Sequence, residues 1–202
     1  GCYKCIETCA YCKDGQVGWT AVYSVASNQI NSKNSKGCFN VTPGPIYVLP
    51  ITGIPIFYTP TVTEILDMFA KVTGCLASTE SDYNVHCHGP GTSYPTIKGA
   101  WGVLQQSVDS FRVCKEPGDP SQICDLTANV NSTINMIISH ATGKKKSVDR
   151  ALRSEMESYH DNKTKTKDCL KSVAPDYSWD VIKGMMDMIQ GVPCSGVSKK
   201  CY

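Results

Sequence analysis

The chain has 202 residues, 12 of them cysteine, and its 20 Lys and Arg side chains nearly balance 18 Asp and Glu, for a formal net charge of +2. This balance argues against nucleic acid as a partner, because phosphate binding requires clustered positive charge. A chain of this length hides roughly 70% of its surface on folding, enough for a real core. We therefore expect one disulfide-stabilised globular domain over 1–202, with a cysteine-rich N-terminal segment (1–36), an uncharged segment (37–63) and a helical core (64–192).

The first twelve residues hold four cysteines with the spacing C-x2-C-x3-C-x2-C. Four thiolates could form a structural zinc site, but zinc ribbons separate their ligand pairs by about 12 to 20 residues. The stretch Cys5–Cys12 resembles the cluster-binding loop of radical S-adenosylmethionine enzymes, yet that loop follows a strand and only four residues precede Cys5. Disulfides explain more of the chain, so we predict that all the cysteines pair in intrachain bridges, with Cys114–Cys124 closing one turn. The set is Cys2, Cys5, Cys9, Cys12, Cys38, Cys75, Cys87, Cys114, Cys124, Cys169, Cys194 and Cys201.

Three N-glycosylation motifs accompany these cysteines, at Asn40, Asn131 and Asn162. Abundant cysteine in an even number together with such motifs is typical of the oxidising secretory pathway. No apolar signal segment opens the chain, so we expect residue 1 to lie near a processed N-terminus. The sequence thus predicts an extracellular glycoprotein, secreted or displayed at the cell surface.

The segment 37–63 contains no charged side chain and carries prolines at a strict spacing of five, at Pro45, Pro50, Pro55 and Pro60. Proline at this frequency forbids a continuous helix, which excludes a transmembrane helix here. We expect an extended region over 45–60 with short β pieces near 46–49 and 54–58. Two interpretations remain open: a strand pair buried against the helical core, or an exposed hydrophobic loop that touches a partner or a membrane.

From Thr61 onward the apolar residues follow helical spacing, which predicts a mainly α fold with a minor β part and about five helical segments. The first helix begins with the capping box Thr61-Val62-Thr63-Glu64 and should stop at Gly74. The other helices are expected from Pro95 to Cys114, from Pro120 to near Gly143, from Ser147 to Tyr159, over 168–173, and from Ser178 to about Gln190.

Candidate binding residues lie in two places. Tyr47, Phe57 and Tyr58 in the extended segment are aromatic anchors of the kind that dominate interfaces. Trp179, Met185 and Met188 lie on a last helix that is apolar around most of its circumference, so they could line a pocket for an apolar ligand. Packing in the core is the competing interpretation for these three.

The histidines of His86-Cys87-His88 could act as an acid–base pair or grip a metal. Because Cys87 is better used in a bridge and no third ligand is evident, we predict that His86 and His88 are not metal ligands. We expect no cofactor, and the chain shows no familiar catalytic motif.

We therefore predict a recognition protein that binds a protein or other extracellular macromolecule. One alternative is a carrier of a small apolar ligand such as a lipid or odorant, similar to secreted insect odorant carriers in being helical and disulfide-tied. A second is a small secreted hydrolase, with polar groups such as Glu7 and Asp82 converging on His86 and His88.

Overall fold

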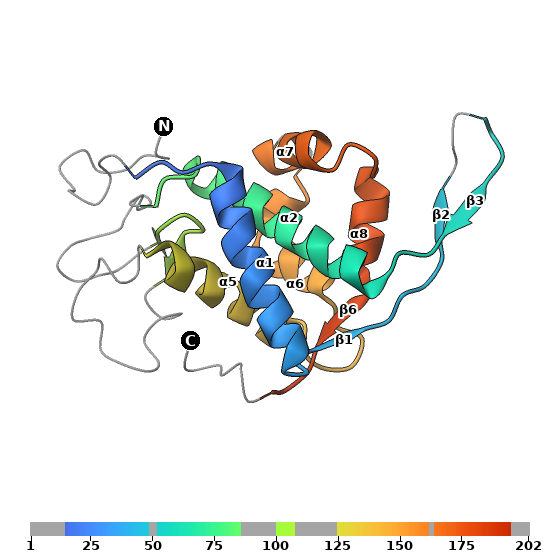
Figure 1. Cartoon of the computed structure of the whole chain (residues 1–202), viewed down its shortest axis with the longest axis horizontal. Coiled ribbons are helices and arrows are strands. Elements are labelled where there is room, and N and C mark those ends of the chain that lie inside the picture. The colour runs from blue at the N-terminus through green and yellow to red at the C-terminus, as the bar shows by residue number, and fades with distance from the viewer. Residues whose placement is uncertain (1–14, 49–51, 86–99, 108–124, 162–163, 195–202) are drawn as a thin grey trace.

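The computed structural model describes residues 15–48, 52–85, 100–107, 125–161 and 164–194, and these form a mainly helical protein with three two-stranded antiparallel sheets (Figure 1). The sequence prediction of a mainly α fold with a minor β part is confirmed. The helices are α1 (Trp19–Ser35), α2 (Val62–Ser81), α5 (Leu126–His140), α6 (Val148–Glu155), the 3-10 turn η2 (Glu157–Tyr159), α7 (Lys165–Val173) and α8 (Trp179–Asp187). The sheets pair β1 (Phe39–Val41) with β6 (Ile189–Gly191), β2 (Ile46–Val48) with β3 (Ile56–Tyr58), and β4 (Ala100–Trp101) with β5 (Gln106–Ser107).

Helix α1 lies within the segment 1–36, which the sequence marks as cysteine-rich without predicting a helix there. The residues that hold this helix in place are Val22, Ala26 and Ile30, which are at most 1% exposed. Their spacing of four places them on one face of a helix. The many Ser and Asn residues around them favour helix caps and turns over helix interiors. The helical spacing of these three apolar residues is therefore hard to recognise in the sequence.

Helix α2 begins as predicted and ends later than predicted. The capping box is present: the Glu64 amide donates to the Thr61 hydroxyl (3.1 Å) and the Thr61 amide donates to the Glu64 carboxylate (3.3 Å). The predicted stop at Gly74 is wrong, because the helix continues to Ser81. A Cβ on Gly74 would lie 2.6 Å from Trp19 Nε1, so this glycine allows α1 to approach closely and does not cap the helix.

The helix predicted between Pro95 and Cys114 is wrong where the structure describes it, because residues 100–107 form the β4–β5 hairpin. The Leu104 amide donates to Asn129 Oδ1 (2.8 Å), and Asn129 Nδ2 donates to the Trp101 carbonyl (2.9 Å). One buried side chain of α5 therefore satisfies two backbone groups of the hairpin. This tertiary pairing overrides the helical spacing of the apolar residues.

The C-terminal helices follow their capping residues. Ser147 and Ser178 each accept a backbone hydrogen bond at the start of α6 and α8, as predicted for both starts. Helix α8 ends at Asp187, short of the predicted end near Gln190. The chain turns into β6 instead, where Ile189–Gly191 pairs with Phe39–Val41.

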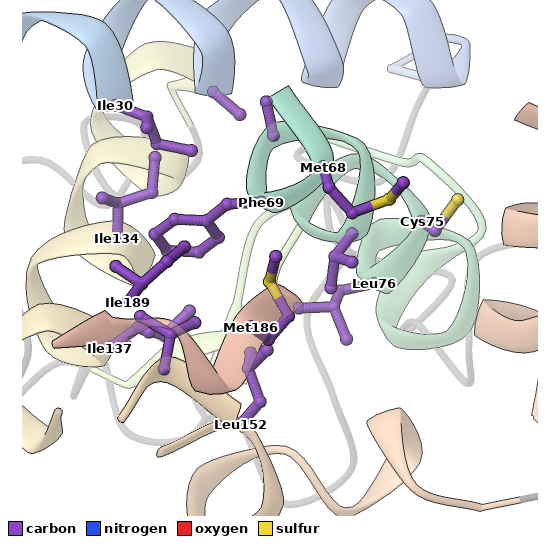
Figure 2. Packing of buried hydrophobic residues seen from close by; sticks show 14 of the residues in the cluster. Ile30, Met68, Phe69, Cys75, Leu76, Ile134, Ile137, Leu152, Met186 and Ile189 are labelled. Atoms are coloured by element: carbon purple, nitrogen blue, oxygen red, sulfur yellow. The ribbon is translucent and has the colours of Figure 1, made fainter. Parts of the chain in front are cut away.

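The core lies where α2 meets the other helices and β6. Figure 2 shows the Phe69 ring of α2 beside Ile134 of α5 and Ile189 of β6, with Met186 of α8 and Leu152 of α6 continuing the cluster. All five side chains are fully buried. No helix within the described ranges combines the length and apolarity needed to span a membrane.

Two disulfides tie this body together. Cys38–Cys194 joins the residue directly before β1 to the segment after β6, and Cys75–Cys169 joins α2 to α7. The remaining eight cysteines, including the predicted pair Cys114–Cys124, lie outside the described residues.

Candidate functional site

The β2–β3 hairpin stands out from one end of the helical body (Figure 1). Its strands pair with the register Ile46↔Tyr58, Tyr47↔Phe57 and Val48↔Ile56. Pro45 and Pro55 each directly precede a strand, where the lack of a backbone donor leaves the ladder intact. The two β pieces expected from the proline spacing are therefore present, and they pair with each other.

The hairpin exposes large apolar side chains. Phe57 is 70% exposed and Tyr47 is 55% exposed, and their rings meet edge to face with centroids 5.8 Å apart. Ile54 (68%) and Ile56 (51%) are exposed on the same hairpin. Ile56 pairs with Val48, so it lies on the face of the strands opposite Tyr47 and Phe57. Among the described residues these four account for all the large exposed hydrophobic side chains except Val62, so the exposure is concentrated on one structural element.

The base of the hairpin is fixed to the helical body by a polar cluster. The Tyr58 hydroxyl donates to the Glu64 carboxylate, and the Tyr177 hydroxyl donates to Glu64 Oε2 at 3.1 Å. The bonds from Tyr58 and from the Thr61 amide lower the pKa of Glu64, while burial and the Glu64 contact raise the pKa of Tyr58. Tyr58 thus anchors the hairpin, whereas Tyr47 and Phe57 face solvent.

Apolar packing adds a second attachment on the strand β2. Ile46 lies over Gly184 of α8, where a Cβ would be 3.5 Å from Ile46 Cδ1. Sequence reasoning named the aromatic residues of the hairpin but missed Ile54, Ile56 and the anchoring groups. The anchors were hidden because Glu64 and Tyr177 are 113 residues apart.

The three candidates predicted on the last helix do not share one surface, and Met188 lies just beyond the end of α8. Met185 is fully buried in the core, and Met188 is half-buried. The Trp179 ring packs against Tyr159 with centroids 5.0 Å apart, and Lys167 Nζ lies 5.2 Å from its ring centre.

The two glycosylation motifs that the structure describes differ in their surroundings. Asn40 is exposed on β1. Asn131 lies inside α5, and its Oδ1 accepts a hydrogen bond from Nζ of Lys33, which is only 4% exposed. Asn162, His86 and His88 lie outside the described residues, so the predictions about them stand as predictions. In the described ranges no three His, Cys, Asp or Glu side chains gather as a metal site would require.

The fold is that of a disulfide-bonded, mainly helical protein from which the apolar β2–β3 hairpin projects. No protein-family model, curated protein or solved structure matches the chain.

Proposed function

We propose that this chain is an extracellular recognition protein that binds another protein through the Tyr47 and Phe57 face of the β2–β3 hairpin. The observation that carries the proposal is the concentration of exposed apolar side chains on this one projecting element. Monomeric proteins rarely expose contiguous apolar patches unless the patch is an interaction site. Disulfides such as Cys38–Cys194 support an extracellular setting.

The hairpin has the properties of an interface core. Charged residues are depleted at such cores and aromatic residues enriched, and 37–63 contains no charged side chain. The edge-to-face pair of Tyr47 and Phe57 is held by a paired strand register, and the Glu64 cluster fixes the base. Binding therefore orders few side chains, and preorganisation of this kind raises affinity.

The apolar-carrier alternative has less support. It needs Met185 to line a ligand cavity, and the Met185 side chain is fully buried within the core cluster. The hydrolase alternative depends on His86 and His88, which lie outside the described residues.

The test compares three baits: the wild-type chain, Phe57→Ser, and Val62→Ser as a matched control, since Val62 is also exposed (39%) but lies outside the strands. Each bait is incubated with extracellular fluid of the source organism, and a captured protein is then purified and titrated. An interface anchor contributes about 2 kcal/mol or more, so Phe57→Ser should weaken the dissociation constant about 30-fold. Val62→Ser should leave it unchanged.

Two results would contradict the proposal. Equal affinity of the wild-type and Phe57→Ser baits would place the interface elsewhere. Binding of the wild-type chain to phosphatidylcholine vesicles, lost in Phe57→Ser, with no protein captured, would show that the hairpin serves a membrane surface instead.

A further inference from the structure

A pocket of about 210 Å³ lies between the last turn of α5 and the segment that follows β6. Its apolar walls come from Ile138, Val192, Pro193 and Cys194, and its polar groups come from Ser139, Thr142 and Lys146. No acidic side chain among the described residues lines it. Apolar walls with a few polar groups are typical of small-molecule sites.

The walls of this pocket are fixed by covalent and hydrogen bonds. The Gly191 amide donates to the Ala141 carbonyl at 3.0 Å, which ties the end of β6 to the end of α5. The Val192 amide donates to the Cys38 carbonyl at 2.9 Å, and the Cys38–Cys194 disulfide holds the same segment two residues later. A ligand would therefore order little of the chain on binding, which lowers the cost of association.

Two of the three polar groups are open to a ligand. The Thr142 hydroxyl donates to the Ile138 carbonyl at 2.7 Å, so its proton is already used. Within the part of the chain that the structure describes, the Ser139 hydroxyl and the Lys146 ammonium have neither a hydrogen-bond partner nor an ion-pair partner. Ser139 is half-buried and Lys146 is exposed, so both can donate to a group that enters from solvent.

The charge around the pocket favours an anion. Lys144 and Lys145 precede Lys146, and none of these three exposed lysines forms an ion pair with a described residue. The C-terminus of α5 carries the partial negative charge of a helix end, but its last carbonyls already accept backbone hydrogen bonds. Three full positive charges outweigh that partial charge.

We propose that this pocket binds a small ionised carboxylic acid with a short apolar body. The carboxylate pairs with the Lys146 ammonium and accepts a hydrogen bond from the Ser139 hydroxyl. The apolar body lies against Ile138, Val192 and Pro193. A volume of about 210 Å³ is below the range of roughly 300–1,000 Å³ that drug-sized ligands occupy, so the acid must be short. This site does not depend on the function proposed for the hairpin.

Nuclear magnetic resonance titration of the full chain at pH 7 tests the proposal with hexanoate and benzoate. Acetate lacks the apolar body and hexylamine carries the opposite charge, so these two are the controls. At least one of the two acids should bind at a single site, at least tenfold more tightly than acetate and hexylamine. The methyl signals of Ile138 and Val192 should shift, while those of Ile54, which is 68% exposed on the hairpin, should stay constant.

Three variants locate the site. Lys146→Gln should weaken binding at least fivefold, whereas the matched control Lys144→Gln, at an exposed lysine outside the pocket lining, should change it less than twofold. Ser139→Leu, which fills the pocket from α5, should weaken binding at least tenfold. The proposal is overturned if neither acid binds, if hexylamine binds equally well, if Lys146→Gln and Ser139→Leu both retain wild-type affinity, if Lys144→Gln loses as much as Lys146→Gln, or if Ile54 shifts as much as Ile138.

Discussion

Replacing Cys75 and Cys169 together by alanine should lower the free energy of unfolding by about 2–4 kcal/mol. The bridge joins α2 to α7 across a sequence separation of 94 residues. In the chain-entropy model, closing a loop of about 100 residues in the unfolded state contributes about 4.7 kcal/mol. The effect should be smaller here, because Cys38–Cys194 encloses the same residues and already restricts the unfolded chain.

The measurement is equilibrium unfolding in urea without reductant, followed by circular dichroism. The slope of the unfolding free energy against urea should increase in the double variant, since an unfolded chain with fewer cross-links exposes more surface. Thr79→Ala is the control: between the same two helices, the Thr79 and Thr166 hydroxyls share a 2.8 Å hydrogen bond, and the Thr166 amide donates to the Thr79 hydroxyl at 3.0 Å. Losing these two contacts, with Thr166 fully buried, should cost about 1–3 kcal/mol with an unchanged slope, so the slope distinguishes the two variants.

A loss below about 1 kcal/mol with an unchanged slope would refute the reasoning, because a cross-link of this loop length must restrict the unfolded state. A loss equal to that of Thr79→Ala, again with an unchanged slope, would assign the stabilisation to helix packing alone.

Two further predictions concern packing and modification. Phe69→Ala should destabilise the fold by about 3–5 kcal/mol, because the Phe69 ring is fully buried. Phe57→Ala should cost less than about 1 kcal/mol, because Phe57 is 70% exposed. Similar losses of unfolding free energy for the two variants in urea would contradict this prediction. In secreted protein, Asn40→Gln should remove the mass of one glycan. Asn131→Gln should leave the mass unchanged, because Asn131 accepts a hydrogen bond from the buried Lys33. Mass spectrometry before and after deglycosylation measures both.

Much of the helical framework could be predicted because its signals are local. The side chains of Thr61, Ser147 and Ser178 each accept a hydrogen bond from the backbone amide three residues later. The start of each of these helices therefore depends on a short stretch of sequence. Proline spacing acts locally too, and it placed β2 and β3. Helix ends were less predictable. Glycine often ends a helix, but Gly74 instead lies inside α2, where it leaves room for Trp19 to pack closely.

Features that depend on distant partners could not be predicted. Residues 100–107 have helical spacing, yet their hairpin is held by Asn129, which lies 25 residues beyond Leu104. The exposure of Tyr47 and Phe57 was undecided for the same reason. An uncharged strand pair suits a core and an interface equally well, and only the attachment of its base to Glu64 and Tyr177 shows which part of the hairpin faces solvent.

In helix α8 the methionines are the most noticeable feature of the sequence, but they lie on the face that packs into the core. Its methionines suggested a ligand cavity, but Met185 and Met186 are fully buried against the core. The same helix also faces two other features: Lys183 and Asp187 line an open, charged pocket beside α6, and Gly184 lies under Ile46 of the hairpin. A Cβ at 184 would be in ordinary van der Waals contact with Ile46 Cδ1, at 3.5 Å, so the apolar hairpin packs closely on a helix whose neighbouring positions carry charge.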